Sequence, residues 1–396
     1  MKYAPDERKE YKAHRLAVDG GCRALGMGNY FNNSSFSLGR HEAYHEESGV
    51  VMETKRIAYL DHLRAVATFA VIMIHVSAQN WYTQDVSTAA WKAFNFYDSI
   101  SRWSVPVFVM ISGALMLGKD ISPKKLYTRK IPHFLIVFLF WSLVYALHMG
   151  GSIETVLINT LRGKSHLWFL YLIVGLYICI PILKKIVEDQ RITVYFLIVS
   201  VVFSFAVPFV LRVLTDFGGE TTKTWAKALT DVYSDMHITV TGGYSACYVA
   251  GHYLSTVKIN KPVRMTIYVV GLLGMAATVF LSLHVSLAQG MPAGDYYEDL
   301  NLNVVAPAVA AFVWFRYDAP SGGRINVIAG KLSACSFGIY LVHILVLEIL
   351  QKQLGLDTLS FDPMLTVPVI SVAVFAISCV ISAVIRKILV LKDHII

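Results

Sequence analysis

The sequence predicts an all-α integral membrane protein, a polytopic bundle of about ten transmembrane helices with both termini in the cytoplasm. Of its 396 residues 55% are hydrophobic and only 16% are charged, with a mean hydropathy of +0.53. An ordinary soluble chain carries about 25% charged residues. Apolar stretches of about 20 residues, the length that crosses a bilayer as a helix, recur along the chain. Basic residues also alternate between successive loops, which sets orientation in a membrane.

Apolar length and flanking charge give the expected spans. The sixth span is rich in Gly, Ser and Tyr, and the eighth is short, so these two have the weakest signal. Within the sixth, the run Thr241–Gly251 has small residues at intervals of about four, which predicts close packing against another helix. The expected spans are 57–78, 102–118, 131–149, 167–183, 192–211, 237–255, 264–287, 302–316, 334–351 and 364–385.

The orientation follows from every second loop being basic. The intervening loops are poorer in Lys and Arg or lean acidic, as at Asp295, Glu298 and Asp299. Since cytoplasmic loops carry the excess of Lys and Arg, we expect the basic loops and both termini in the cytoplasm. The net charge of +8 is spread over these loops and forms no single patch, which argues against a nucleic-acid partner.

The first 51 residues differ in composition from the rest. They are polar, without apolar periodicity, and predict a disordered N-terminal extension, whereas 52–396 form the membrane domain. Met52 is a candidate native start. The first apolar run begins near Ile57, so no cleavable signal peptide is expected. The five cysteines are scattered without metal or redox spacing, and we assign no disulfide and no metal.

The first span carries polar residues where lipid is expected. At 100° per residue Asp61, Thr68 and His75 fall within about 60° of Arg64, so they form one stripe. Ionisable groups in a bilayer are costly unless they face the bundle interior or water, which predicts a functional site. Arg64 and His75 are separated by roughly 16 Å along the helix. Each alone is also explained by a side chain that extends to the membrane surface, but their shared face favours function.

The second span begins with Arg102 near the outer edge and has Ser112 and Gly113 near mid-depth. Pro106 predicts an early kink, and Gly113 permits close approach of a neighbour or a ligand. Arg102 taken alone is more typical of an interfacial anchor beside Trp103.

Two later spans carry further candidates. The fourth opens with His166, Trp168 and Tyr171, of which the two aromatic residues are also typical of an interfacial belt. The ninth has Tyr340 and His343 on one face. A hydrogen-bonded packing seam between helices is the alternative explanation for this pair.

Together these segments resemble the acyltransferase-3 family of membrane acyltransferases, and most closely its branch that acetylates surface polysaccharides and enterobacterial common antigen. The resemblance extends from about Ile57 to the C-terminus, with the spans in order. The segments that carry it are LDHLRA followed by His75, SVPVFVMISG from Ser104, YTRKIP around Arg129, HLWFLYL from His166, and SFGIYLVH from Ser336.

The resemblance implies transfer of an acyl group, acetyl, from cytoplasmic acetyl-CoA to a hydroxyl of a cell-envelope glycan or lipid-linked sugar. It further implies a multi-pass protein of the bacterial cytoplasmic (inner) membrane, in contact with membrane lipid. In this family the arginine and histidine matched by Arg64 and His75 are essential. His75 would act either as a general base toward the hydroxyl or as a nucleophile that carries the acyl group.

The resemblance and the residue types suggest roles for the other positions. Arg64, Arg129 and Lys130 are expected to hold the phosphates of the donor, with Asp61 orienting Arg64. Arg102 is expected to stabilise the oxyanion or the acceptor. Candidate substrate-binding residues are His166, Trp168, Tyr171, Ser112, Tyr340 and His343.

The main alternative is a transporter or flippase for a lipid-linked sugar, in which the intramembrane His and Arg form a relay. That class predicts paired discontinuous helices and an internal repeat, and the sequence shows neither.

Overall fold

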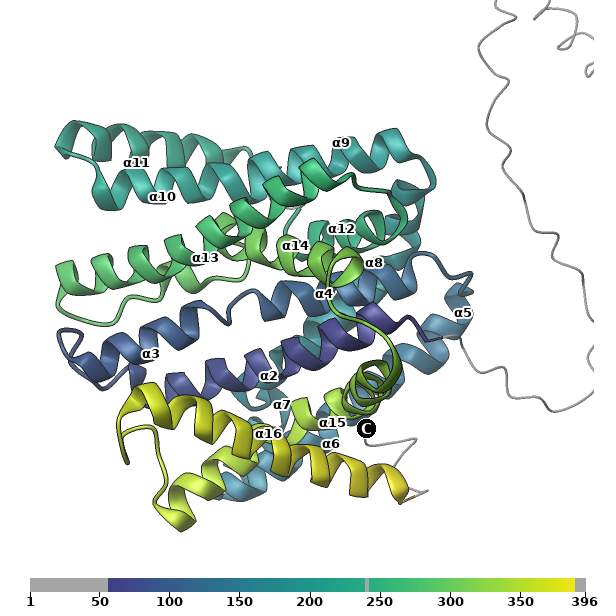
Figure 1. Cartoon of the computed structure of the whole chain (residues 1–396), viewed down its shortest axis with the longest axis vertical. Helices are drawn as coiled ribbons and strands as arrows, with labels where there is room; N and C mark the ends of the chain where they lie inside the picture. The colour runs from purple at the N-terminus through teal and green to yellow at the C-terminus, as the bar shows by residue number, and fades with distance from the viewer. Residues whose placement is uncertain (1–55, 239–241, 389–396) are drawn as a thin grey trace, which may run out of the picture. The chain divides into compact units, whose positions relative to one another are not determined.

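A computed structural model of the chain describes residues 56–238 and 242–388, and every regular element within them is helical (Figure 1). In this part of the chain nine helical segments are long and apolar enough to cross a membrane. This confirms the predicted all-α polytopic bundle. The expected disorder of residues 1–51 and the candidate start at Met52 lie outside the described residues. The orientation of the termini stays a prediction.

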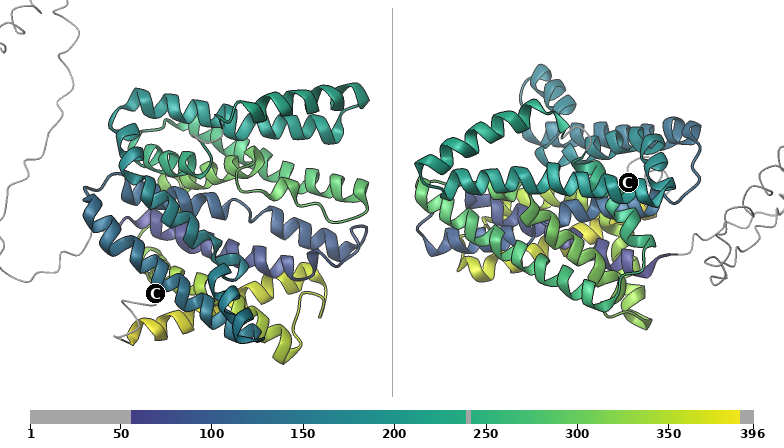
Figure 2. Two further views of the ribbon diagram at one scale, coloured as in Figure 1. Left: turned by 180° about the vertical axis from the view of Figure 1, so that it is seen from behind. Right: turned by 90° about the horizontal axis from the view of Figure 1, so that it is seen from above.

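Helix α2 (Ala58–Trp81), which carries the polar stripe, lies in the middle of the bundle. It packs against α3 and α4 on one side and against α15 and α16 on the other (Figure 1). Helix α6 crosses the others obliquely, as the view from behind in Figure 2 shows. The central place of α2 explains how its ionisable residues avoid lipid. The bounds of the helices are α3 (Ala89–Ser99), α4 (Ser104–Met116), α6 (Ile131–Met149), α7 (Ile153–Arg162), α8 (Trp168–Glu188), α9 (Gln190–Ser200), α10 (Val207–Phe217), α13 (Lys261–Gln289), α14 (Leu302–Tyr317), α15 (Gly323–Leu354) and α16 (Pro363–Lys387).

The second predicted span is two helices, and it begins earlier than expected. Helix α3 ends at Ser99 and α4 begins at Ser104, so Arg102 lies in the break between them. Pro106 accounts for the break: inside a helix its ring would clash with the carbonyl of Arg102, four residues earlier, whereas in a first turn it is tolerated. The expected kink is therefore a full interruption, which frees Arg102 from the regular helix.

Two other prolines each follow a short π-helical segment. Leu126–Lys130 precedes Pro132 at the start of α6, and Val201–Ala206 precedes Pro208 at the start of α10. A proline cannot donate to the carbonyl four residues before it, and a wider turn relieves the clash with that carbonyl. Hydropathy alone gives no signal for these segments, and the third and fifth spans were predicted without them.

The sixth predicted span, 237–255, is shorter in the structure. Helix α12 (Tyr244–Thr256) begins only after Gly243, whose φ of 69° is accessible to glycine but costly for other residues. A polar helix that the sequence analysis did not predict, α11 (Glu220–Asp235), precedes it. Helix α12 is not one of the nine candidate spans, so the prediction of an uninterrupted transmembrane helix here was wrong.

The close packing predicted for the small residues of α12 is confirmed. A Cβ atom added to Gly113 of α4 would lie 1.8 Å from the carbonyl oxygen of Tyr248, and one added to Gly251 would lie 1.9 Å from that of Met110. The two helix backbones therefore touch, each through a glycine of one helix against a carbonyl of the other. This contact fixes the position of α4 against α12.

We expect Gly113→Ala to destabilise the protein by at least about 1–3 kcal/mol, because the added methyl group meets backbone that cannot move aside. The thermal unfolding midpoint of purified protein in detergent measures the effect. Gly175→Ala is the matched control: Gly175 lies inside α8 with open space around its added Cβ, so alanine there should be neutral or stabilising. Equal midpoints for the two variants would contradict the close contact.

Candidate active site

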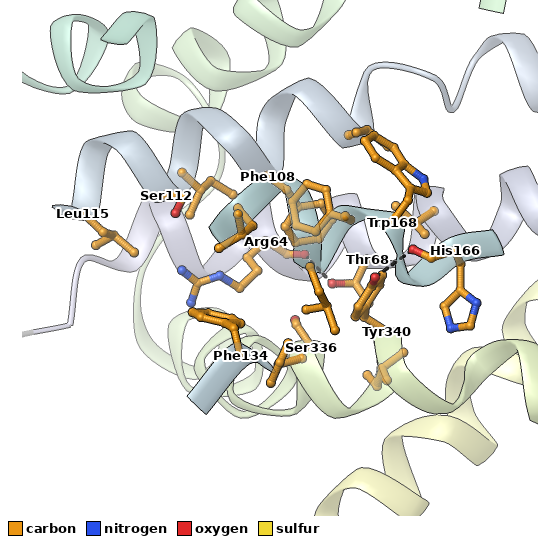
Figure 3. A pocket seen from close by; sticks show the side chains of 18 of the residues that line it. Arg64, Thr68, Phe108, Ser112, Leu115, Phe134, His166, Trp168, Ser336 and Tyr340 are labelled. Carbon is orange, nitrogen blue, oxygen red and sulfur yellow. Dashed lines mark hydrogen bonds between the residues drawn. The ribbon is translucent and has the colours of Figure 1, made fainter. Parts of the chain in front are cut away.

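A cavity of about 390 Å³ lies inside the bundle, between α2, α4, α6, α8 and α15. Most of its lining is aliphatic and aromatic, including Phe108, Phe134, Trp168 and Phe169. Figure 3 shows part of this lining along the length of α2. The polar side chains that line it are Arg64, Thr68, His75, Ser112, Lys119, Lys130, His166, Tyr177, Ser336, Tyr340 and His343.

Three cations line one end of the cavity. Arg64 is half-buried there, and its Nη1 donates a hydrogen bond of 3.2 Å to Ser333 Oγ. Lys119, after α4, and Lys130, before α6, line the same cavity and are exposed. In Figure 3 Arg64 lies near Ser112 and Phe134, at the opposite end from His166. An anionic group entering from solvent would meet these three side chains first.

Two residues expected to help bind the donor do not line the cavity. Arg129, one position before Lys130, is exposed and is not among the residues that line the cavity. Asp61 forms no ion pair with Arg64 within the described residues and lies instead near Gly330, whose carbonyl accepts a hydrogen bond from Arg56. The roles of Arg129 and Asp61 therefore stay predictions.

Three imidazoles meet at the other end of the cavity. The ring centroid of His343 lies 5.1 Å from that of His75 and 5.2 Å from that of His166, and the His75–His166 distance is 6.3 Å. The hydroxyl of Tyr340 donates to the backbone carbonyl of His166 at 2.7 Å and ties α15 to the start of α8 (Figure 3). The described residues hold no group of three or more His, Cys, Asp or Glu side chains arranged to bind a metal ion.

The structure thus brings together residues that the sequence placed in three different spans. His75 comes from α2, His166 precedes α8, and Tyr340 and His343 come from α15. Trp168 lines the cavity, and 41% of its surface is exposed. Tyr340 and His343 line the cavity, and Tyr340 also forms a hydrogen bond between helices, so both the substrate-binding role and the packing seam stay predictions.

Arg102 does not line the cavity in this structure. Its guanidinium is bonded in parallel to the carboxylate of Asp98, with Nη2 2.8 Å from Oδ2, and lies 4.4 Å from the ring centroid of Tyr297. Asp98 is only 1% exposed, so a buried carboxylate already compensates the charge of Arg102. A role toward the oxyanion or the acceptor stays a prediction. The sequence analysis did not identify Asp98 as the partner of Arg102, although two opposite charges four residues apart predict an ion pair on a helix.

Tyr171 is also outside the cavity. It is exposed, its hydroxyl donates to the carbonyl of Leu161, and its ring packs on Phe138. Its predicted role in binding the substrate stays untested. Lys119 and Tyr177, in contrast, line the cavity without having been singled out. Lys119 belongs to a loop recognised as basic, but hydropathy could not show which of its cations turns inward.

A family model described as an acyltransferase domain matches residues 57–383. The match covers the bundle from the beginning of α2 almost to the end of α16. Neither a curated protein nor a solved structure matches this chain.

Proposed function

This chain belongs to the acyltransferase-3 family, and we propose that it transfers an acetyl group from cytoplasmic acetyl-CoA to a hydroxyl of a cell-envelope glycan or lipid-linked sugar. The observation that carries this proposal is one cavity with cations at one end and imidazoles at the other. A thioester donor has the complementary order of groups, with phosphates at one end of a long uncharged arm and the acyl group at the other.

The lining of the cavity supports this placement of the donor. Arg64, Lys119 and Lys130 offer charge-assisted hydrogen bonds to phosphate oxygens. Between them and the imidazoles the wall is aromatic and aliphatic, as at Phe108 and Phe134, which suits an uncharged arm. Along α2 the eleven residues from Arg64 to His75 rise roughly 16 Å, so the arm would have to extend about that far.

His75 supplies the chemistry at the acyl end by one of two routes. As a general base it takes the proton of the acceptor hydroxyl while the oxygen attacks the thioester carbonyl, the C–S bond breaks and the thiol leaves. As a nucleophile it attacks the thioester first and then passes the acyl group to the hydroxyl. Both routes need a neutral imidazole with one unprotonated nitrogen toward the substrate.

The proposed orientation places the cationic mouth in the cytoplasm, together with the basic loops and both termini. The imidazole end then lies in the outer half of a bacterial cytoplasmic membrane. An acceptor would approach past Trp168, an exposed residue at the imidazole end of the cavity. The arm of the donor then carries the acyl group through about half of a hydrocarbon core of roughly 30 Å, while the phosphates stay on the cytoplasmic side.

Acetyl-CoA labelled in the acetyl group, added to protein in lipid nanodiscs with a glycan-containing envelope extract, tests the proposal. We expect label in glycan or lipid-linked sugar that depends on the protein. Movement of the sugar across vesicle membranes without any transfer of label would instead support the transporter alternative. Label that never leaves acetyl-CoA with any acceptor would overturn the proposal.

A further inference from the structure

The middle imidazole of the cluster is held by its own helix. His343 is fully buried, and its Nδ1 lies 2.7 Å from the carbonyl oxygen of Tyr340 and 3.2 Å from that of Ile339. A carbonyl only accepts hydrogen bonds, so Nδ1 carries the proton. In the neutral ring the other nitrogen, Nε2, is then a bare acceptor.

That acceptor has no partner. Within the described part of the chain, Nε2 of His343 is buried and makes no hydrogen bond. The ring lines the cavity, and because Nδ1 is turned to the carbonyls of α15, Nε2 lies on the opposite edge of the ring. Leaving a buried acceptor unpaired is energetically costly. Such an atom beside a proposed reacting group indicates a donor that engages it during catalysis.

The spacing of the rings admits two donors, His75 and His166. A hydrogen bond joins two nitrogens at about 2.9 Å and each nitrogen lies roughly 1 Å from its ring centroid, so bonded imidazoles have centroids about 5 Å apart. His75 lies 5.1 Å from His343, and it forms no hydrogen bond through its ring to any other described residue. His166, at 5.2 Å, is the competing donor.

We propose that His343 is a positioning residue for His75: its Nε2 accepts the N–H of His75, which leaves the second nitrogen of His75 unprotonated toward the substrate. This inference rests on the proposed function. When the O–H bond of the sugar hydroxyl breaks, its proton passes to the second nitrogen of His75. The oxygen then forms the C–O bond, the C–S bond breaks, and the thiolate takes the proton. Throughout, the bond to His343 fixes the tautomer and orientation of His75.

Two amide substitutions separate this role from packing. The carbonyl of glutamine in His343→Gln reaches the place of Nε2 and can accept from His75. In His343→Asn the asparagine side chain reaches only the place of Nδ1. It therefore keeps the hydrogen bond to the carbonyls of α15 but gives His75 no hydrogen-bond acceptor. We expect the Gln variant to stay within about tenfold of the wild-type kcat. The Asn variant should lose on the order of 10²-fold in kcat with KM for acetyl-CoA unchanged.

Equal losses in the two variants, or a loss in KM alone, would overturn the inference. His166→Phe tests the competing donor: if its loss equals that of His343→Asn and the double variant is no worse, His343 serves His166 instead and the inference fails. Should the Asn variant not fold, ¹⁵N NMR of histidine-labelled wild-type protein decides, since a protonated Nε2 on His343 contradicts the proposal. Absence of transfer by the wild type would overturn the proposed function itself, which distinguishes the two failures.

Discussion

His75→Ala is expected to lower the rate of acyl transfer by at least about 10²–10⁴-fold, the usual effect of removing a general base, and by more if His75 carries the acyl group. The imidazole lines the cavity with its ring centroid 6.3 Å from that of His166, which lies at the far end from Arg64 in Figure 3. Its loss should therefore leave acetyl-CoA binding within about threefold of the wild type. Rates come from transfer of labelled acetyl in nanodiscs, and binding comes from titration of the same preparation.

His284→Ala is the matched control for this prediction. His284 is an exposed histidine of α13, stacked on Phe217 and outside the cavity, so its loss should leave the transfer rate within about twofold of the wild type. Wild-type transfer by the His75→Ala protein would exclude both routes proposed for this residue. A matching loss of donor binding would place the phosphates, and not the acyl group, beside His75.

The part of the site that the sequence predicted best lies on single helices. Asp61, Arg64, Thr68 and His75 were assigned to one stripe from helical periodicity alone, and all of them except Asp61 line the cavity. Periodicity works here because α2 is regular and central, so a polar face has to point inward. The same argument brought Tyr340 and His343 of α15 into the site.

What periodicity could not predict depends on irregular backbone and on neighbouring chain segments. Arg102 was placed on a continuous helix, but the break before α4 turns it to Asp98 and Tyr297. Asp61 lies only three residues before Arg64, yet the neighbouring α15 supplies Ser333 as the partner of Arg64 instead. Such choices between partners depend on tertiary packing, for which a single sequence has no signal.

The order of the helices around α2 could not be predicted from the sequence either. Hydropathy gives the spans but not which of them touch, so the meeting of α2, α8 and α15 at three imidazoles came only from the structure. The glycine contacts between α4 and α12 are the exception, because small residues at intervals of about four predicted close packing. They did not identify α4 as the partner.

Arg64→Ala is expected to weaken acetyl-CoA binding by about 10- to 100-fold, since it removes a charge-assisted hydrogen bond of about 1.5–3 kcal/mol from the cationic end of the cavity. The stabilisation of the protein against heat by acetyl-CoA measures this affinity. Arg64→Lys should recover part of the loss, because lysine restores the charge without the planar pair of donors. Wild-type binding should also weaken as salt rises, and the variant's binding should weaken less.

Lys185→Ala serves as the control, because Lys185 is an exposed cation of α8 that pairs with Glu188 and lies outside the cavity. Its loss should leave acetyl-CoA binding unchanged within about twofold. Comparison with His75→Ala separates the proposed role of Arg64 in donor binding from that of His75 in acyl transfer. The His75→Ala variant should bind acetyl-CoA far better than Arg64→Ala does while transferring less label. Equal losses of donor binding in the two variants would contradict a donor with its phosphates at Arg64 and its acyl group at His75. The donor would then bind in the opposite orientation, or another molecule would occupy the cavity.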